Sequence, residues 1–205
     1  MNDTETKNTA VKAPALMSTR PVTAQDALDQ CEKLSPMMVH YCQTKTGLTD
    51  PANTILFYRL GDFYEMFFED ATLVSKELEL TLTGKDCGME ERAPMCGIPY
   101  HAAEGYINRL VENGHKVAIC EQMEDPKQAK GMVKREVIRV VTPGTTLIPQ
   151  GLDETKNNYI MSIVCMEGCF GISTADISTG QCFVTEMDKP RRLVDEITKF
   201  MPAEI

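Results

Sequence analysis

Residues 55–67 have the sequence ILFYRLGDFYEMF, in which two runs rich in aromatic and aliphatic side chains flank Gly61-Asp62. Such runs favour β-strands, and a two-residue break that contains glycine favours a tight turn. The stretch therefore predicts a β-hairpin. Because side chains alternate along a strand, Phe63 and Glu65 are expected on one face and Tyr64 on the other.

The sequence around the hairpin predicts further helices and strands. A helix over residues 63–68 competes with the second strand, because Glu69-Asp70 could open the next helix slightly earlier. Upstream, Ser35-Pro36 predicts the N-cap and first residue of a helix that ends at Gly47. The other elements expected before residue 146 are a helix after residue 69, a short strand over 80–83, a polar loop over 84–93, an extended segment over 94–100, a helix over 101–113 and strands over 117–120 and 133–141.

Composition divides the chain into four segments. Residues 1–34 are expected to be a flexible N-terminal extension, although residues 24–34 could form a short helix. Residues 35–145 form one domain of ordinary size, and residues 146–157 are interpreted as a linker. Residues 158–205 predict three antiparallel strands and one helix, a small core that looks truncated. The predicted fold class is α+β (mixed α/β), with a mixed sheet flanked by helices in the first domain.

The overall composition excludes several classes of protein. The chain has 205 residues and a formal net charge of -9, and its hydrophobic fraction of 42% is typical of a globular protein. It contains no run of about 18 apolar residues and no signal-peptide core, so we expect a cytoplasmic location and no membrane contact. Residues 126–140 hold five basic side chains and one acidic side chain. An acidic chain with one basic segment is not an obvious nucleic-acid binder, and any phosphate contact would have to be local.

The sequence lacks the motifs of common enzymes. The Gly84-Lys85 pair is followed by Asp86, so the chain has no phosphate-binding loop of the GxxxxGK[ST] type. It also has no GxGxxG, no GxSxG and no CxxC, which removes the usual signals for dinucleotides, serine hydrolases and zinc. Asp176 could serve a two-metal nuclease, but partner carboxylates cannot be identified. We therefore expect no catalytic residue, metal or cofactor in this chain.

Phe63 and Glu65 are the most informative pair of residues. An aromatic ring beside a carboxylate on an exposed hairpin face suits a stacking contact with a nucleic-acid base and a hydrogen bond to the edge of that base. The competing interpretation is structural, because aromatic residues of a hairpin usually belong to the core and a glutamate between them is usually solvated.

Five blocks of the sequence resemble the N-terminal region of the MutS family of bacterial DNA mismatch-repair proteins. They occur in the order of the family and are SPMM (35–38), FYRLGDFYEMF (57–67), PMCGIPYH (94–101), AICEQ (118–122) and RVVTPGT (139–145). Residues 158–205 resemble, less distinctively, the start of the family's connector domain, which has a ribonuclease-H-like fold without the nuclease site. Because proteins of this family are far longer, the chain is expected to be an N-terminal fragment: a mismatch-recognition domain followed by a truncated connector domain.

The resemblance implies a function and assigns residues to it. Proteins of this family recognise mispaired or looped-out bases in duplex DNA from the minor groove, during post-replicative mismatch repair. Phe63 corresponds to the wedge that is inserted beside the mispaired base and kinks the duplex. Glu65 corresponds to the carboxylate that hydrogen-bonds this base, and we expect its charge to penalise intact duplex more than mismatched duplex.

Six further residues are implied as contacts to the DNA backbone or groove: Arg135, Lys134, Lys85, Arg139, Pro94 and Met95. The four basic side chains would meet phosphates, and Arg135 matches a basic residue that the family places near the backbone. Pro94 and Met95 fall in a segment that resembles the family's minor-groove-flanking loop.

The resemblance also implies partners. These are double-stranded DNA with a mismatch or small loop, a second copy in a full-length homodimer, and downstream mismatch-repair proteins in the bacterial cytoplasm near the nucleoid. ATP and Mg²⁺ are expected only in a C-terminal region that the 205 residues do not include. This chain is therefore expected not to be an enzyme, although the full-length protein would be an ATP-dependent mismatch sensor. The alternative function is a protein-interaction module that contacts sister domains or repair partners without binding DNA itself.

Overall fold

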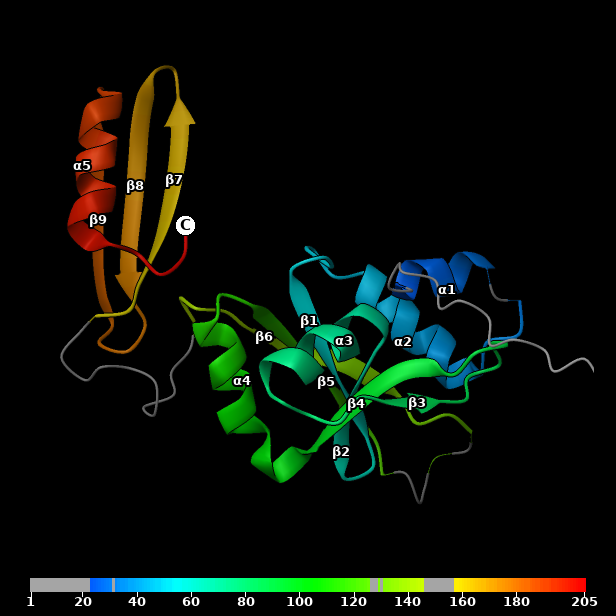
Figure 1. Ribbon diagram of the computed structural model, residues 1–205. Helices are drawn as coiled ribbons and strands as arrows, with labels where there is room; N and C mark the ends of the chain where they lie inside the picture. Colours follow the sequence, from blue (N-terminus) through cyan, green and yellow to red (C-terminus); the bar gives the residue numbers. More distant parts are fainter. Residues whose placement is uncertain (1–22, 31, 126–128, 130, 146–156) are drawn as a thin grey trace, which may run out of the picture.

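The structure, a computed structural model, describes residues 23–30, 32–125, 129, 131–145 and 157–205. The described residues form two sheets with their helices, coloured blue to green and yellow to red in Figure 1. Most of the predicted N-terminal extension and nearly all of the predicted linker lie outside the described residues. None of the helices in these ranges is both long and apolar enough to cross a membrane.

The first unit is a mixed six-stranded sheet with strand order β3-β4-β2-β1-β5-β6. Strands β1 and β5 run parallel, and the other neighbouring strands pair antiparallel. The elements are α1 (Ala24–Gln30), α2 (Pro36–Thr46), β1 (Thr54–Leu60), β2 (Phe63–Phe67), α3 (Phe68–Glu77), β3 (Thr83–Lys85), β4 (Ala93–Pro99), the 3-10 helix η1 (Tyr100–Ala102), α4 (Ala103–Glu112), β5 (Lys116–Gln122) and β6 (Arg135–Val141). The predicted mixed sheet flanked by helices is thus confirmed.

Helices cover both faces of this sheet, and the core is therefore divided into two layers. Ile55 and Phe57 of β1 pack with residues of α3 and α4, whereas Leu56 and Tyr58 pack with residues of α1 and α2. All four side chains are buried. A strand that is covered on both faces needs apolar residues at every position, which explains the unbroken apolar run at the start of β1.

The hairpin prediction is confirmed, and the competing helix over residues 63–68 is wrong. Strand β2 ends at Phe67, and helix α3 begins directly at Phe68. The short strand predicted over residues 80–83 lies later, at Thr83–Lys85, because it pairs with Ala93–Met95 of β4. A pairing with a distant strand fixes this position, and local sequence does not report it.

Residues 24–30 form helix α1, which lies within the 24–34 stretch where a short helix was expected. Ala24 and Ala27 are buried in the core layer that contains α2. The hydroxyl of Thr23 accepts a hydrogen bond from the Asp26 N–H, and the Asp26 carboxylate accepts one from the Thr23 N–H, both at 3.1 Å. This reciprocal pair is a capping box, a signal for a helix start that the sequence carried.

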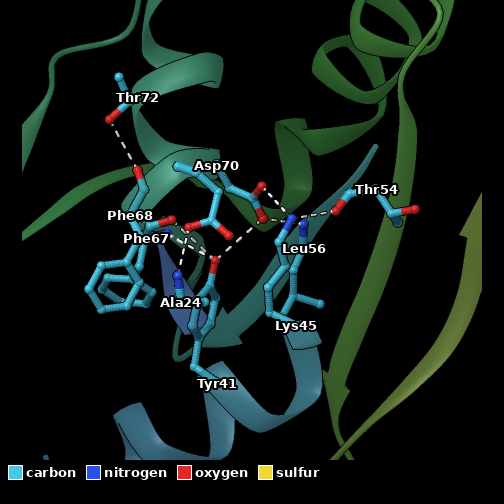
Figure 2. A network of polar contacts seen from close by, with 10 residues as sticks. Ala24, Tyr41, Lys45, Thr54, Leu56, Phe67, Phe68, Asp70 and Thr72 are labelled. Carbon is cyan, nitrogen blue, oxygen red and sulfur yellow. Dashed lines mark hydrogen bonds and ion pairs between the residues drawn. The ribbon is translucent and has the colours of Figure 1, made fainter. Parts of the chain in front are cut away.

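A buried ion pair joins helices α2 and α3 to strand β1 (Figure 2). The Lys45 ammonium donates to the Asp70 carboxylate at 2.6 Å and to the Thr54 carbonyl at 2.7 Å. The second carboxylate oxygen of Asp70 accepts from the Leu56 N–H at 2.8 Å. Burial raises the pKa of Asp70 to about 6, and the neighbouring Lys45 charge opposes that rise. The ion pair therefore links three elements, although the burial of its two charges carries a desolvation penalty.

The second unit is an antiparallel three-stranded sheet with one helix packed on one face. Its elements are β7 (Tyr159–Met166), β8 (Cys169–Asp176), β9 (Gln181–Met187) and α5 (Pro190–Phe200). Met161, Ile172 and Met187 form its core, against which Leu193 and Ile197 of the helix pack. The three predicted strands and the helix are confirmed, and with them the α+β fold class.

Candidate nucleic-acid interface

Phe63 lies at the tip of the β1–β2 hairpin, directly after the turn. Leu60 and Phe63 form the pair that closes the hairpin, and Gly61 adopts the left-handed φ of +59° that a tight turn requires. Phe63 is 46% exposed, whereas Tyr64 is 7% exposed and Met66 is fully buried. The predicted alternation is therefore confirmed, and the Phe63 ring lies outside the core.

Glu65 is held in an ion pair with Lys85. The Lys85 ammonium donates to a Glu65 carboxylate oxygen at 2.6 Å, and 16% of the Glu65 side chain is exposed. Lys85 belongs to β3, and the intervening strand β4 places Gly97 opposite Glu65. A Cβ atom at Gly97 would lie 3.5 Å from the Glu65 Cγ, so the Glu65 side chain lies against the backbone of β4. The structure thus brings two predicted site residues together, and the carboxylate of the pair belongs to the residue two positions after Phe63 on β2.

Pro94 and Met95 lie in strand β4 and not in a loop. Met95 stands opposite Phe67 on one side and Thr83 on the other, and Pro94 pairs with Gly84. The segment that was expected to flank the minor groove is therefore part of the sheet that carries Phe63. Both side chains are partly exposed.

The three basic residues predicted near β6 differ in their surroundings. Arg135 is buried: its Nε donates to the Arg59 carbonyl at 2.8 Å and its Nη1 to the Val133 carbonyl at 2.9 Å. Lys134 and Arg139 are exposed. The ammonium of Lys134 lies 2.7 Å from Glu136, and the hydrogen bond to this carboxylate raises the pKa of the lysine. Arg135 holds the strands together in this structure, whereas Lys134 and Arg139 remain accessible to a phosphate.

Four side chains around the hairpin turn are not among the sequence-predicted site residues: Arg59, Tyr100, Glu121 and Gln122. The Arg59 guanidinium stacks on the Tyr100 ring at 3.5 Å from its centroid, and Gln122 accepts a hydrogen bond from the Gly61 N–H at 3.1 Å. The Tyr64 hydroxyl donates a hydrogen bond to the Glu121 carboxylate. Burial is the main cause, and this hydrogen bond the second, of a rise in the pKa of Tyr64 to about 12. The position of Arg59, two residues before Gly61 of the predicted turn, was the available signal in the sequence.

The chemistry of this surface is that of binding. It offers an exposed ring for stacking, a carboxylate that can accept a hydrogen bond, and accessible basic side chains at β6. In the described ranges, no three His, Cys, Asp or Glu side chains gather where they could hold a metal ion. Asp176 is buried and accepts hydrogen bonds from the Ser178 N–H and hydroxyl at 2.9 and 2.6 Å, which lower its pKa. These hydrogen bonds show that Asp176 stabilises the turn after β8. They give no support to the alternative that Asp176 is a metal ligand of a nuclease.

Two family models match the chain in succession. MutS domain I matches residues 35–149, and MutS domain II matches residues 158–205. The fold, the exposed hairpin and the two matched domains together define the class of this protein. The chain carries sequence of the first two domains of a MutS-type protein.

Curated proteins confirm this placement. Proteins named DNA mismatch repair protein MutS are 65% identical over 173 residues in Lachnoclostridium phytofermentans, 55% over 175 residues in Alkaliphilus metalliredigens and 56% over 175 residues in Acetivibrio thermocellus. The chain belongs to the MutS family. Each alignment covers 84% of this chain but only 18% or 20% of the relative, so the chain spans about a fifth of the length of these relatives.

Proposed function

We propose that this chain is the mismatch-sensing part of a DNA mismatch repair protein and binds mispaired or looped-out bases in duplex DNA from the minor groove. One observation carries the proposal: Phe63 is 46% exposed at the tip of a hairpin, two residues before Glu65 on the same strand, within the segment that matches MutS domain I. The relatives are named for mismatch repair. A partly exposed apolar ring at the tip of a hairpin suits insertion between bases.

The wedge works because of the energetics of base stacking. Unstacking a base step costs a few kcal/mol, and the cost is least where the base pair is already mismatched. A duplex also kinks most cheaply at such a flexible step. Phe63 therefore selects deformable DNA and needs no particular base, so one site can serve many mismatches.

Glu65 supplies the second part of the selection. Its carboxylate can accept a hydrogen bond from a displaced base, while its negative charge opposes the approach of phosphates. Lys85 offsets this charge in the free protein, since the two groups are 2.6 Å apart. We assign Lys85 to Glu65 and not to the DNA backbone. Exposed Lys134 and Arg139 are the candidates for phosphate contact, and buried Arg135 acts by holding β6 to β1.

The remaining properties belong to the proposal for the whole protein. We propose that the full-length protein senses mismatches in an ATP-dependent manner, as a homodimer, and passes the signal to downstream mismatch-repair proteins. ATP and Mg²⁺ would bind outside these 205 residues, in which the GxxxxGK[ST] motif is absent.

A second candidate function is favoured by the open face of the second unit. Val164, Met166 and Val184 are 54%, 68% and 79% exposed on the sheet face opposite α5. Exposed apolar side chains that lie together on one face are typical of an interaction surface. This unit could therefore contact sister domains or repair partners while the first unit does not bind DNA.

Fluorescence anisotropy with labelled duplexes tests which function applies. At low salt we expect the 205-residue chain to bind a duplex with one mismatch at least about tenfold more tightly than the matched duplex, because part of the stacking energy is regained on the ring. Affinity for both duplexes should fall as salt rises, since phosphate contacts release counterions. Equal affinities would contradict the proposal, and failure to bind either duplex would favour the interaction module.

Replacing Glu65 by Gln tests the repulsive role of its charge. We expect the affinity for matched duplex to rise about threefold to tenfold, because one negative charge near phosphates is removed. Affinity for mismatched duplex should change less, since Gln can still accept a hydrogen bond, so the preference for mismatches falls. Glu196→Gln on α5 removes the same charge far from the hairpin and serves as the control. Unchanged matched-duplex affinity in Glu65→Gln would refute the repulsive role.

A further inference from the structure

We propose that Arg59 is a positioning residue of this interface: with Tyr100 and Glu121 it forms a brace that fixes the Gly61-Asp62 turn and so sets the direction of the Phe63 ring. This inference rests on the proposed function, because the brace supports the ring that is proposed to enter the duplex. All contacts of the brace are made between residues of this chain.

The backbone of the turn is fastened from three sides. The Gly61 carbonyl accepts a hydrogen bond from the Arg59 Nε at 2.5 Å, and the Gly61 N–H donates to Gln122 of β5 at 3.1 Å. The Asp62 carbonyl accepts from the Tyr100 N–H at 3.0 Å. A two-residue turn at the end of a hairpin is ordinarily held only by its own strands. Here β5 and η1 hold it too.

Arg59 connects these fastenings through its side chain. Its guanidinium lies between the Tyr100 ring, 3.5 Å from the centroid, and Glu121, 3.7 Å from the Arg59 Nη1. Tyr64 of β2 donates its hydroxyl to the same Glu121 oxygen. The Arg59 carbonyl accepts from buried Arg135 at 2.8 Å. One side chain is thus in contact with the turn, with η1 and with β5, while its backbone is tied to β6.

Phe63 can act as a wedge only if the turn that carries it keeps its position. Because the Phe63 ring is nearly half exposed, its own packing does not fix its direction. If the turn could yield, the ring would bend away and the base step would stay stacked. A turn that is already ordered loses little conformational freedom on binding, which favours the complex.

A direct phosphate contact by Arg59 is the competing role. Only 16% of its side chain is exposed, and Nε and Nη1 already face Gly61 and Glu121. Replacement by lysine separates the two roles. Lysine keeps the charge that a phosphate needs, but it lacks the planar fork that stacks on Tyr100 and bonds the turn.

The first measurement needs no DNA. We expect backbone NMR order parameters at residues 61–63 near 0.85 in the wild-type chain and below about 0.6 in Arg59→Gln and Arg59→Lys, while the rest of β2 stays ordered. Arg192→Gln on α5 removes the same charge and should leave the turn unchanged. Glu121→Gln keeps Arg59 and should show a smaller loss of order, so it serves as a second probe if Arg59→Gln does not fold. An unchanged turn in a folded Arg59 variant overturns the brace.

The second measurement uses matched and mismatched duplexes. In both Arg59 variants, the ratio of the affinity for mismatched duplex to that for matched duplex should fall about fivefold to tenfold. The affinity for matched duplex should stay within about twofold of the wild-type value. Full restoration by Arg59→Lys, or an equal loss for both duplexes, would make Arg59 a phosphate contact and overturn the brace. A turn that loosens as expected in a chain without any mismatch preference would contradict the proposed function and leave the brace standing.

Discussion

Phe63→Ala is expected to lower the affinity for mismatched duplex by about tenfold to hundredfold, because stacking of an aromatic ring on a base contributes about 1–3 kcal/mol. Affinity for matched duplex should stay within about twofold, since phosphate contacts dominate it. The free energy of unfolding should change by less than about 0.5 kcal/mol, because the ring is 46% exposed and lies outside both core layers. Anisotropy titrations at low salt and urea unfolding measure the three quantities.

The chain offers a matched control for this substitution. Phe183 on β9 is also 46% exposed, so Phe183→Ala removes the same group at the same exposure from the second unit. We expect its mismatch preference to equal that of the wild type. If Phe63→Ala keeps the preference, or if both variants lose it equally, the wedge is refuted.

Lys45→Met should lower the free energy of unfolding by about 3–5 kcal/mol near neutral pH, because it leaves the Asp70 carboxylate buried without its cation. Lys116→Met is the matched control. Its ion pair with Asp50, at 3.6 Å, is on the surface, and the expected loss is at most about 1 kcal/mol. Urea unfolding followed by circular dichroism measures both losses.

The pH dependence of this loss of stability distinguishes an effect of the Asp70 charge from an effect of packing. The pKa of Asp70 is about 6 in the folded chain, above its ordinary value of 3.8, because burial outweighs the attraction of Lys45. The stability contributed by this group is therefore full below about pH 4 and is lost as the pH rises through about 6. Without Lys45 the pKa of Asp70 rises further, so stability keeps falling over a wider range.

The loss in Lys45→Met should consequently be larger at about pH 8 than at about pH 5. Adding Asp70→Asn to Lys45→Met removes the unpaired carboxylate and should recover at least about half of the loss at about pH 8. Equal losses at both pH values, with no recovery in the double variant, would show that Lys45 acts by packing and not by charge.

The sequence predicted most elements of the fold because turn residues, side-chain alternation and helix caps act between residues close together in the chain. The turn residues and the alternation around Phe63 required one hairpin, and Ser35-Pro36 marked the start of α2, whose Ser35 hydroxyl accepts a hydrogen bond from the Met38 N–H. Helix α1 lies within residues 24–34, where a short helix was expected, and its Thr23–Asp26 capping box marks its start.

The sequence by itself determined the hairpin, the placement of Phe63 and Glu65 on one face, and the resemblance to the MutS family. These follow from periodicity and motif order, which act between neighbours in the chain. Only the tertiary structure decided that Lys85 neutralises Glu65, that Arg135 is buried and that Arg59 braces the turn. Each of these arrangements includes a contact between strands that are distant in sequence: Glu65 with Lys85, Arg59 with Arg135, and Arg59 with Glu121. Their partners depend on the strand order β3-β4-β2-β1-β5-β6, which the pattern within one strand does not encode.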